Sequence, residues 1–314
     1  MTSAPDIAAI HAAANTIAAE VRRTPLVPAD HDRQRLEGRV LMKLECLQVT
    51  GSFKPRGAIN TLRSLSPDEI RRGIITASGG NHGLAVAYAG HVAGAPATIY
   101  LPTSAPKAKV AKLEAWGAKV VVEGAVWDEA NRAALDEAER RGLTYIHPFA
   151  DPRVIAGQGT LGLEILEQAP ELDTVLVAIG GGGLISGIAL AVKAVRPKVK
   201  LIGIEPTGAP TLYESRKARK LVELARIDTA AGTLAPRKSA ALNLEIVTGH
   251  VDEIMLVSDE EMRHAARWLW FEHGIAAELS GAASLALLLS GRYKPKPAET
   301  VCALVCGAGT DGIG

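Results

Sequence analysis

The sequence predicts an α/β protein of two domains, each built on an open, twisted, mostly parallel sheet with helices on both faces. Strand-like apolar runs alternate with helix-like runs along most of the chain, which is the rhythm of βαβ units. The length of 314 residues exceeds that of one typical domain. Hydrophobic residues make up 47% of the chain, so a sizeable core is expected.

The first series of elements lies between residues 40 and 141. Short apolar runs predict strands at Val40–Leu44, Gly73–Thr76, Ala97–Leu101 and Lys119–Val122. Longer helix-like segments predict helices that start near Lys54 and His82, and helices over Lys107–Trp116 and Trp127–Arg141. Strands that alternate with helices in this way pair in parallel, and the helices cover both faces of the sheet.

A second series begins after His147-Pro148-Phe149. Its expected elements alternate helix and strand, at Gly159–Gln168, Thr174–Ile179, Leu184–Val195 and Lys200–Ile204. The stretch Glu205–Asn243 is rich in Pro, Gly and basic residues and is expected to be irregular. We therefore place the larger domain at residues 1–72 plus 151–314 and a smaller, inserted domain at residues 73–150.

The charge of the chain is balanced. It carries 35 Lys and Arg against 34 Asp and Glu, a formal net charge of +1. Because the basic residues are scattered, the composition has no footprint of nucleic-acid or anionic-membrane binding. A small-molecule partner is expected instead.

Cysteine usage and the first residues indicate a cytoplasmic protein. Cys46, Cys302 and Cys306 form an odd set without CxxC spacing, which implies neither a disulfide framework nor a structural zinc site. The alanine-rich start lacks a basic segment followed by a continuous apolar run, so no export signal is expected. The uncharged stretch Thr174–Val192 contains four consecutive glycines, so it predicts strand, loop and helix rather than a membrane span.

One lysine lies where a loop opens a helix, within Thr50–Ala58. The amine of Lys54 would meet the positive end of the helix dipole and lose part of its hydration, and both effects lower its pKa toward the neutral nucleophile that a Schiff base needs. A single lysine at a helix start is more often simply solvated. The assignment therefore depends on the motifs that accompany it.

A glycine run follows an apolar strand and opens a helix at Gly180–Leu184. Backbone N–H groups that no Cβ blocks, aligned with a helix dipole, form a phosphate cradle. A dinucleotide site is the alternative, with Glu205 as the acid that binds the ribose. The G-x-G-x-x-G register fails, however, because Ile185 and Ser186 stand where the third glycine would be required.

Two further segments carry candidate groups. Ser78–Gly83 turns a strand into a helix, so its N–H groups and the Ser78 hydroxyl can hold a carboxylate; the alternative is an ordinary N-cap by Ser78 or Asn81. Cys306 ends a strand and enters a glycine turn, although an isolated cysteine at such a place is usually a small buried hydrophobe.

Together these motifs resemble the pyridoxal-phosphate enzymes of fold type II, the tryptophan-synthase β type, and within them the serine/threonine dehydratase branch. The resemblance covers nearly the whole chain. Sulfhydrylases of a sister branch have Thr where this chain has His82. The segments that carry the resemblance are Lys43–Glu45, Thr50–Ala58, Ser78–Gly83, Asp151-Pro152, Ile155–Thr160, Gly180–Leu184, Glu278–Ala283 and Cys306-Gly307.

The resemblance implies pyridoxal 5'-phosphate as cofactor and gives roles to individual residues. Lys54 would bind the cofactor covalently and act as the catalytic base, Phe53 would pack on its pyridine ring, and Asn81 would contact the ring hydroxyl. The cofactor phosphate would be held by Gly180, Gly181, Gly182, Gly183 and Leu184. The substrate carboxylate would be held by Ser52, Ser78, Gly79, Asn81 and His82.

The partner of the pyridine nitrogen falls on Cys306. A thiol cannot give this nitrogen a full proton as an aspartic acid can, so the ring is a weaker electron sink. Transamination and decarboxylation are thereby disfavoured, while elimination of a β-leaving group remains accessible.

The implied activity is conversion of L-threonine, L-serine or a related β-hydroxy amino acid to a 2-oxo acid and ammonia, by a homodimer or homotetramer. Alternatives are an amino-acid racemase, a β-replacement synthase of the same fold, and a non-catalytic nucleotide-binding α/β protein. Racemases that resemble this family have a serine where this chain has Gly79, so we expect almost no racemisation. Many relatives carry an acidic, cation-binding residue after Thr-Leu-Ala; Pro236 and Arg237 follow it here, so no metal site is expected.

Overall fold

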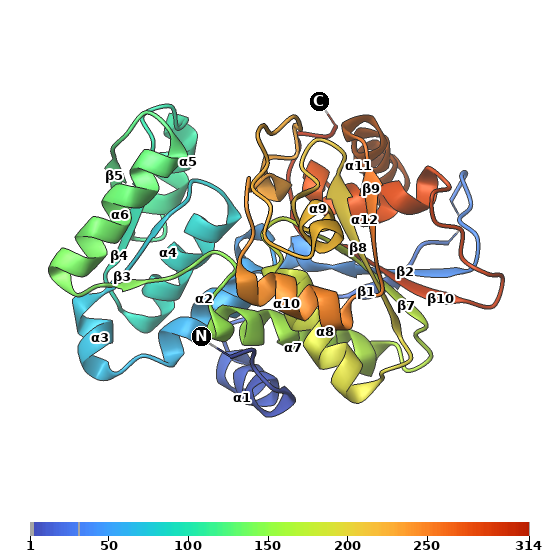
Figure 1. Cartoon of the computed structure of the whole chain (residues 1–314), viewed down its shortest axis with the longest axis horizontal. Coiled ribbons are helices and arrows are strands. Elements are labelled where there is room, and N and C mark those ends of the chain that lie inside the picture. Colours follow the sequence, from blue (N-terminus) through green and yellow to red (C-terminus); the bar gives the residue numbers. More distant parts are fainter. Residues whose placement is uncertain (1–2, 31, 314) are drawn as a thin grey trace.

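The computed structural model describes residues 3–30 and 32–313, and the domain ends predicted at Met1 and Gly314 lie outside this part (Figure 1). Within it the chain forms two bodies, each with its own sheet. The larger body contains a six-stranded sheet of order β1-β2-β10-β7-β8-β9, and the smaller body a four-stranded sheet of order β5-β4-β3-β6. All neighbouring strands pair in parallel except β1 and β2. The predicted fold class is confirmed.

The smaller body is one continuous stretch of chain. Its strands are β3 (Ile74–Ala77), β4 (Ala97–Leu101), β5 (Lys119–Val122) and β6 (Thr144–Tyr145), and its helices are α4 (Asn81–Ala93), α5 (Lys107–Glu114) and α6 (Trp127–Arg141). The two faces of the sheet have separate apolar cores. Ile74, Ile99 and Leu101 face α4, whereas Ile75, Ala77 and Tyr100 face α6.

The larger body takes strands from both ends of the chain. Its strands are β1 (Leu26–Pro28), β2 (Arg39–Leu44), β7 (Thr174–Ala178), β8 (Lys200–Pro206), β9 (Glu253–Val257) and β10 (Thr300–Val305). The remaining helices are α1 (Ile7–Ile17), α2 (Lys54–Arg63), α3 (Pro67–Arg72), α7 (Pro152–Gln168), α8 (Gly183–Val195), α9 (Thr211–Ala218), α10 (Ala241–His250), α11 (Asp259–His273) and α12 (Leu279–Leu289). Figure 1 shows α7 and α8 on one face of the sheet and α11 and α12 on the other. Helix α2 contacts both α4 and α7, so it lies between the two bodies.

Two sequence-based expectations need correction. Helix α7 begins at Pro152 rather than at Gly159, because Asp151 caps it and Gly157 allows α2 to approach: a Cβ at Gly157 would lie 2.6 Å from the Gly57 Cα. The stretch from Glu205 to Asn243 is irregular only in part, since it contains α9 and the start of α10. Both carboxylate oxygens of Glu205 accept N–H groups of α9, a partner that local sequence does not reveal.

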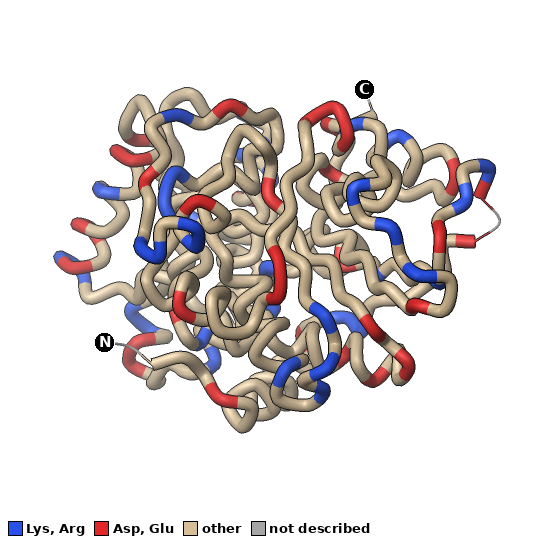
Figure 2. Tube along the Cα trace, turned by 45° about the vertical axis from the view of Figure 1, so that its right-hand side comes forward, with Lys and Arg blue, Asp and Glu red and all other residues tan. Residues whose placement is uncertain are grey.

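The stretch Thr174–Val192 forms β7, a glycine loop and most of α8, as predicted. None of the helices in the described part of the chain is both long and apolar enough to cross a membrane. Basic and acidic residues are interspersed over both bodies (Figure 2).

Candidate active site

Lys54 is the first residue of α2 and is partly buried. Its Nζ donates a 2.7 Å hydrogen bond to the Pro148 carbonyl and lies 5.2 Å from the centre of the Phe53 ring. Burial lowers the pKa of Lys54 to about 8, although nearby Cys306 and Glu278 act in the opposite direction. An amine with this pKa is partly neutral near pH 8 and can take up a proton or attack a carbon atom.

The loop before this lysine has a strained backbone. Thr50 has φ of 64°, in the left-handed region that β-branched residues rarely adopt. The loop is bound to the residues that follow β10. The Ala308 N–H donates to the Gly51 carbonyl at 2.8 Å, and Ser52 forms an isolated antiparallel β-bridge with Gly307. The hydroxyls of Thr50 and Ser52 are buried and have no hydrogen-bond partner among the described residues, which leaves both able to contact a ligand.

The four-glycine loop connects β7 to α8 at a place where no side chain fits. A Cβ at Gly181 would lie 2.2 Å from the Phe149 ring, and one at Gly183 would lie 2.7 Å from the Phe149 carbonyl. Gly182 has φ of 96°, which favours glycine, and Leu184 is buried in the first turn of α8. The first N–H groups of a helix have no partner within it, so this loop is suited to an anion.

The loop from Ser78 to His82 brings the smaller body to the site. The Ser78 hydroxyl accepts the Gly80 N–H at 3.3 Å, and a Cβ at Gly79 would lie 3.1 Å from the Leu101 Cδ2. The His82 ring is turned away from the loop: its Nε2 donates to the Ile146 carbonyl at 2.9 Å. Burial lowers the pKa of His82 to about 3, so the ring is neutral and its one N–H is already donated to Ile146.

Asn81 joins this loop to the larger body through Glu278. Its Nδ2 donates to the Glu278 Oε1 at 2.8 Å, and the Ser280 hydroxyl donates to the same oxygen at 2.5 Å. Burial raises the pKa of Glu278. No role for Glu278 follows from the sequence alone, where the only available signal is its place in the segment Glu278–Ala283.

Cys306 lies directly after β10 and is buried. Its Sγ donates to the Ser280 carbonyl at 3.5 Å, and its own carbonyl accepts the Phe53 N–H at 3.3 Å. Burial raises the pKa of Cys306, so it stays a neutral thiol. Cys306, Cys302 and Cys46 are all free and buried.

The side chain of Arg56, near the start of α2, belongs to a buried ionic cluster. Arg56 donates to both carboxylate oxygens of Glu45, at 2.8 and 2.7 Å, and to Glu164 at 2.9 Å. The Lys43 amine donates to the other oxygen of Glu164 at 2.5 Å. Because Arg56 follows Lys54 by half a turn, this cluster fixes the start of the helix that carries the lysine.

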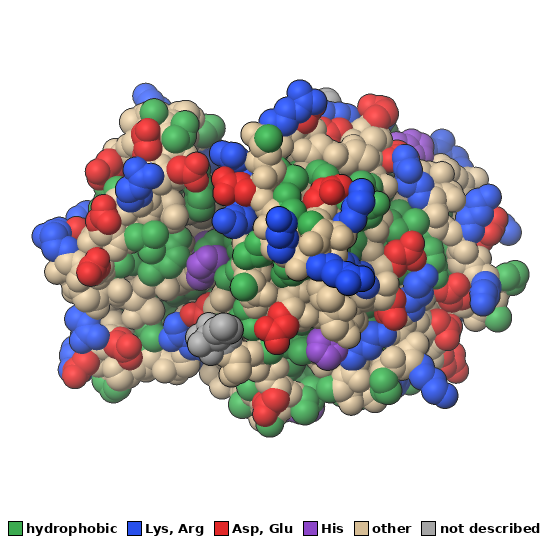
Figure 3. Space-filling view, in the orientation of Figure 1, with side chains coloured by type: hydrophobic (Ala, Val, Ile, Leu, Met, Phe, Trp, Pro, Cys, Tyr) green, Lys and Arg blue, Asp and Glu red, His purple; other side chains and the backbone are tan. Residues whose placement is uncertain are grey.

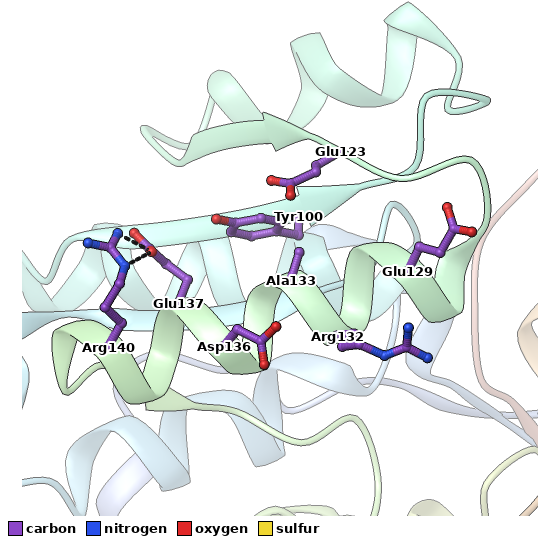
Figure 4. Close-up of a pocket in the computed structure, with 8 residues that line it drawn as sticks. All are labelled: Tyr100, Glu123, Glu129, Arg132, Ala133, Asp136, Glu137 and Arg140. Atoms are coloured by element: carbon purple, nitrogen blue, oxygen red, sulfur yellow. Dashed lines mark hydrogen bonds and ion pairs between the residues drawn. The ribbon is translucent and has the colours of Figure 1, made fainter.

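Residues of both bodies thus meet around Lys54, and Figure 3 shows the surface hollowed between the smaller body on the left and the larger body on the right. A separate surface cavity of about 370 Å³ lies on the α6 face of the smaller sheet, opposite the face that α4 covers. Figure 4 shows that its charged side chains are carried mainly by α6, with Glu137 bound to Arg140. It contains none of the predicted site residues; its lining is Tyr100, Glu123, Glu129, Arg132, Ala133, Asp136, Glu137 and Arg140.

Comparison with known proteins assigns the family. A sequence model described as "Pyridoxal-phosphate dependent enzyme" matches residues 17–307. The chain belongs to this family. Its cofactor is therefore pyridoxal phosphate.

Relatives within the pyridoxal-phosphate family carry informative names. The chain is 41% identical to the L-threonine ammonia-lyase of Thermotoga maritima over 281 residues, which are 90% of this chain and 70% of that protein. It is 40% identical to the L-threonine dehydratase catabolic TdcB of Staphylococcus aureus over 294 residues, 93% of this chain and 85% of that protein.

Solved structures of similar proteins agree. The threonine deaminase of Solanum lycopersicum, isoform 2 in its processed form, superposes with a TM-score of 0.90 at 34% identity, covering 98% of this chain and 87% of that one. Maize serine racemase superposes with a TM-score of 0.90 at 34% identity, covering 97% and 94%.

The residues present fit the cofactor of this family. The glycine loop leaves a cradle that any Cβ would fill, and α8 presents free N–H groups to it. A partly buried amine with lowered pKa and two buried hydroxyls without partners lie on one loop. In their chemistry these groups match an aldehyde with a phosphate tail.

Proposed function

We propose that the protein is a pyridoxal-phosphate-dependent dehydratase that converts L-threonine, L-serine or a related β-hydroxy amino acid to a 2-oxo acid and ammonia by α,β-elimination. The observation that carries this proposal is the partly buried Lys54 amine at the junction of the two bodies, 2.7 Å from the Pro148 carbonyl and beside the Phe53 ring. The names of the two relatives, an L-threonine ammonia-lyase and an L-threonine dehydratase, support the substrate class.

Each predicted residue has a role in this proposal. Pyridoxal phosphate, when bound, withdraws electrons from the Cα of an amino acid. Lys54 takes the Cα proton at Nζ, which requires the neutral amine that burial favours. The N–H groups of Gly180, Gly181, Gly182, Gly183 and Leu184 hold the phosphate.

Ser52, Ser78, Gly79, Asn81 and the His82 backbone orient the substrate carboxylate, and much of the rate gain is due to this orientation. Phe53 packs on the pyridine ring. The Cys306 thiol offers the pyridine nitrogen a weak hydrogen-bond donor without giving it a full proton.

Racemisation is the second candidate, favoured by the similarity to maize serine racemase. It requires an acid–base group on each face of the substrate Cα. Gly79 has no side chain to supply the second one, so we propose elimination as the main reaction.

The nucleotide-binding alternative has lost its support. Both oxygens of the Glu205 carboxylate accept backbone N–H groups, from Leu212 at 2.8 Å and from Tyr213 at 2.7 Å. This buried acid is therefore not available to a ribose.

A keto-acid assay over a panel of L-amino acids tests the proposed function. Production of 2-oxo acid and ammonia from L-threonine or L-serine is expected, together with near-visible absorbance of the purified protein. Absorbance without keto acid from any β-hydroxy amino acid would contradict the dehydratase and favour a racemase or synthase.

We also propose a cytoplasmic homodimer or homotetramer. Three free thiols support a reducing compartment. Trp270 and Phe271, exposed by 43% and 71%, support a contact between subunits.

The division into residues 1–72 plus 151–314 and residues 73–150 stays a prediction, and the two sheets support it.

A further inference from the structure

One short segment connects the smaller body to the larger one and contacts both sides of the site. Ile146–Phe149 follows β6 and precedes α7. The Ile146 carbonyl accepts the His82 Nε2–H at 2.9 Å. The Pro148 carbonyl accepts the Lys54 amine at 2.7 Å. The conformation of this crossing segment therefore sets where the lysine amine lies.

The same segment also supports the glycine loop. The Phe149 ring occupies the space that a side chain at Gly181 would need, 2.2 Å from the position of a Cβ. Asn243 Nδ2 donates to the carbonyls of both residues, at 3.1 Å for Phe149 and 2.7 Å for Gly181. A shift of Phe149 would therefore move the wall of the cradle.

A single imidazole holds this turn. His147 Nδ1 accepts the N–H groups of Phe149 and Ala150, at 3.1 and 2.9 Å. Pro148 has no N–H of its own. The turn therefore depends on a side-chain acceptor rather than on a backbone ladder. The His147 ring also contacts the Phe149 ring edge-on, with centres 4.7 Å apart.

The hydrogen bonds define the state of the ring. An Nδ1 that accepts two N–H groups carries no proton, so the proton is on Nε2 and the ring is neutral. Burial lowers the pKa of His147 to about 4, with the Lys54 amine acting in the same direction. The ring therefore keeps its acceptor at every pH at which Lys54 can act as a base.

We propose that His147 is a positioning residue: by accepting two backbone N–H groups it aims the Pro148 carbonyl at the Lys54 amine and seats Phe149 against the glycine loop. The kinetic part of this inference rests on the proposed dehydratase function. The structural part concerns the chain alone.

Three variants separate the acceptor from the volume of the ring. His147→Asn keeps an acceptor, because its Oδ1 can bond the N–H two residues on as in an Asx turn. His147→Leu keeps bulk without an acceptor, and His147→Ala keeps neither. His11→Ala, on the exposed face of α1, is the matched control.

We expect kcat with L-threonine to fall about tenfold in the Leu and Ala variants, with KM within about twofold, because a misplaced base loses rate rather than affinity. The Asn variant and the control should stay within about threefold of the parent. Loss of cofactor from the holoenzyme on dilution, followed by absorbance, should be faster for Leu and Ala than for Asn. A kcat close to that of the parent in the Leu variant, together with a reduced kcat in the Asn variant, would overturn the proposal.

A measurement on the unmodified protein is independent of activity and of variant folding. Imidazole ¹⁵N spectra should show His147 as the neutral Nε2–H tautomer from pH 5.5 to 8. An Nδ1–H tautomer, or protonation in that range, would overturn the proposal. If the protein fails to act on β-hydroxy amino acids but the tautomer and cofactor-retention results hold, the proposed function fails and the positioning role stands.

Discussion

Lys54 combines burial with a fixed acceptor on one amine. Two other lysines differ from it: the Lys43 amine is buried but bound to the Glu164 carboxylate at 2.5 Å and to Gln168 at 2.8 Å, and Lys107 is exposed on α5. Only an amine that is partly neutral and not closed by a carboxylate can both bind an aldehyde and accept a proton. Residue-scale chemistry thus separates one lysine from its neighbours.

Borohydride reduction of the holoenzyme followed by peptide mapping should place the label on Lys54. Lys54→Ala should lower the rate about a thousandfold, because a general base is lost. Lys107→Ala is the control and should leave the rate unchanged. Label on Lys43 or Lys107 would show that the assignment is wrong.

Cys306→Ser should keep the cofactor and much of the elimination activity, because a hydroxyl offers a similar hydrogen bond to the one a thiol gives. Absorbance and keto-acid formation measure both, and we expect a rate within about tenfold of the parent. Cys302→Ser, which changes a buried thiol within β10, the strand that Cys306 follows, should affect stability alone. Complete loss of cofactor in the Cys306 variant would mean that the thiol has another role.

Gly79→Ser should raise the yield of D-enantiomer from L-serine, because a hydroxyl would then supply the second acid–base group. Its Cβ would lie 3.1 Å from the Leu101 Cδ2 and 3.5 Å from the Lys109 Cδ, both of them side-chain atoms that can shift. Gly80→Ser, with open space around its Cβ, is the matched control. Chiral chromatography decides, and abundant Cα inversion by the unmodified protein would contradict the role of Gly79.

At the scale of elements, α9 is attached to β8 through one buried acid. Glu205 accepts the first free N–H groups of α9, yet burial outweighs this stabilisation and raises its pKa to about 8. The folded state therefore favours the protonated acid. Its contribution to stability is complete below the unfolded pKa and is lost as the pH rises toward about 8.

Glu205→Gln should remove this dependence, because an amide cannot ionise. Between pH 5 and pH 9 the variant should gain stability relative to the parent, on the order of 2–4 kcal/mol. Urea unfolding at the two pH values measures the difference, with Glu245→Gln on exposed α10 surface as control. A constant difference across the range would contradict the raised pKa.

The elements also separate what local sequence predicts from what it does not. Strand β4, strand β5 and helix α6 have the predicted bounds, because their apolar patterns are bounded by glycine or proline turns. Helix α9 escaped prediction because its start is bound by the buried carboxylate of Glu205, whose burial the sequence around α9 does not reveal. At the site, Lys54 and the glycine loop follow from local motifs, whereas the contacts of Glu278 with Asn81 and of Pro148 with Lys54 join segments remote in sequence.

At the scale of the whole molecule, residues of both bodies form the site. Basic and acidic residues are evenly mixed over the two bodies (Figure 2). Pro236 and Arg237, which follow Thr233-Leu234-Ala235, both make contacts within the protein. Arg237 is bound to Glu223 at 3.4 Å, and the Pro236 carbonyl accepts the Thr211 hydroxyl at 2.7 Å. Across residues 3–30 and 32–313, no three His, Cys, Asp or Glu side chains are grouped for a metal ion.

Treatment with a chelator should leave the keto-acid rate within about twofold of the untreated enzyme, because neither proline nor a paired arginine ligates a cation. Added magnesium or calcium should change it equally little. Loss of activity on chelation, restored by either ion, would show that a cation site exists.

The position of β10 has a consequence for synthesis of the chain. This strand is the last in the sequence, yet it lies between β2 and β7 near the middle of the larger sheet. The smaller body can complete its sheet before β10 has been synthesised, but the larger sheet cannot be completed until β10 emerges from the ribosome. Until then β2 and β7 present bare edges, which are sites of aggregation. The Lys54 loop is bound to Gly307 and Ala308, so a nascent chain that is shorter than this lacks contacts that hold the site.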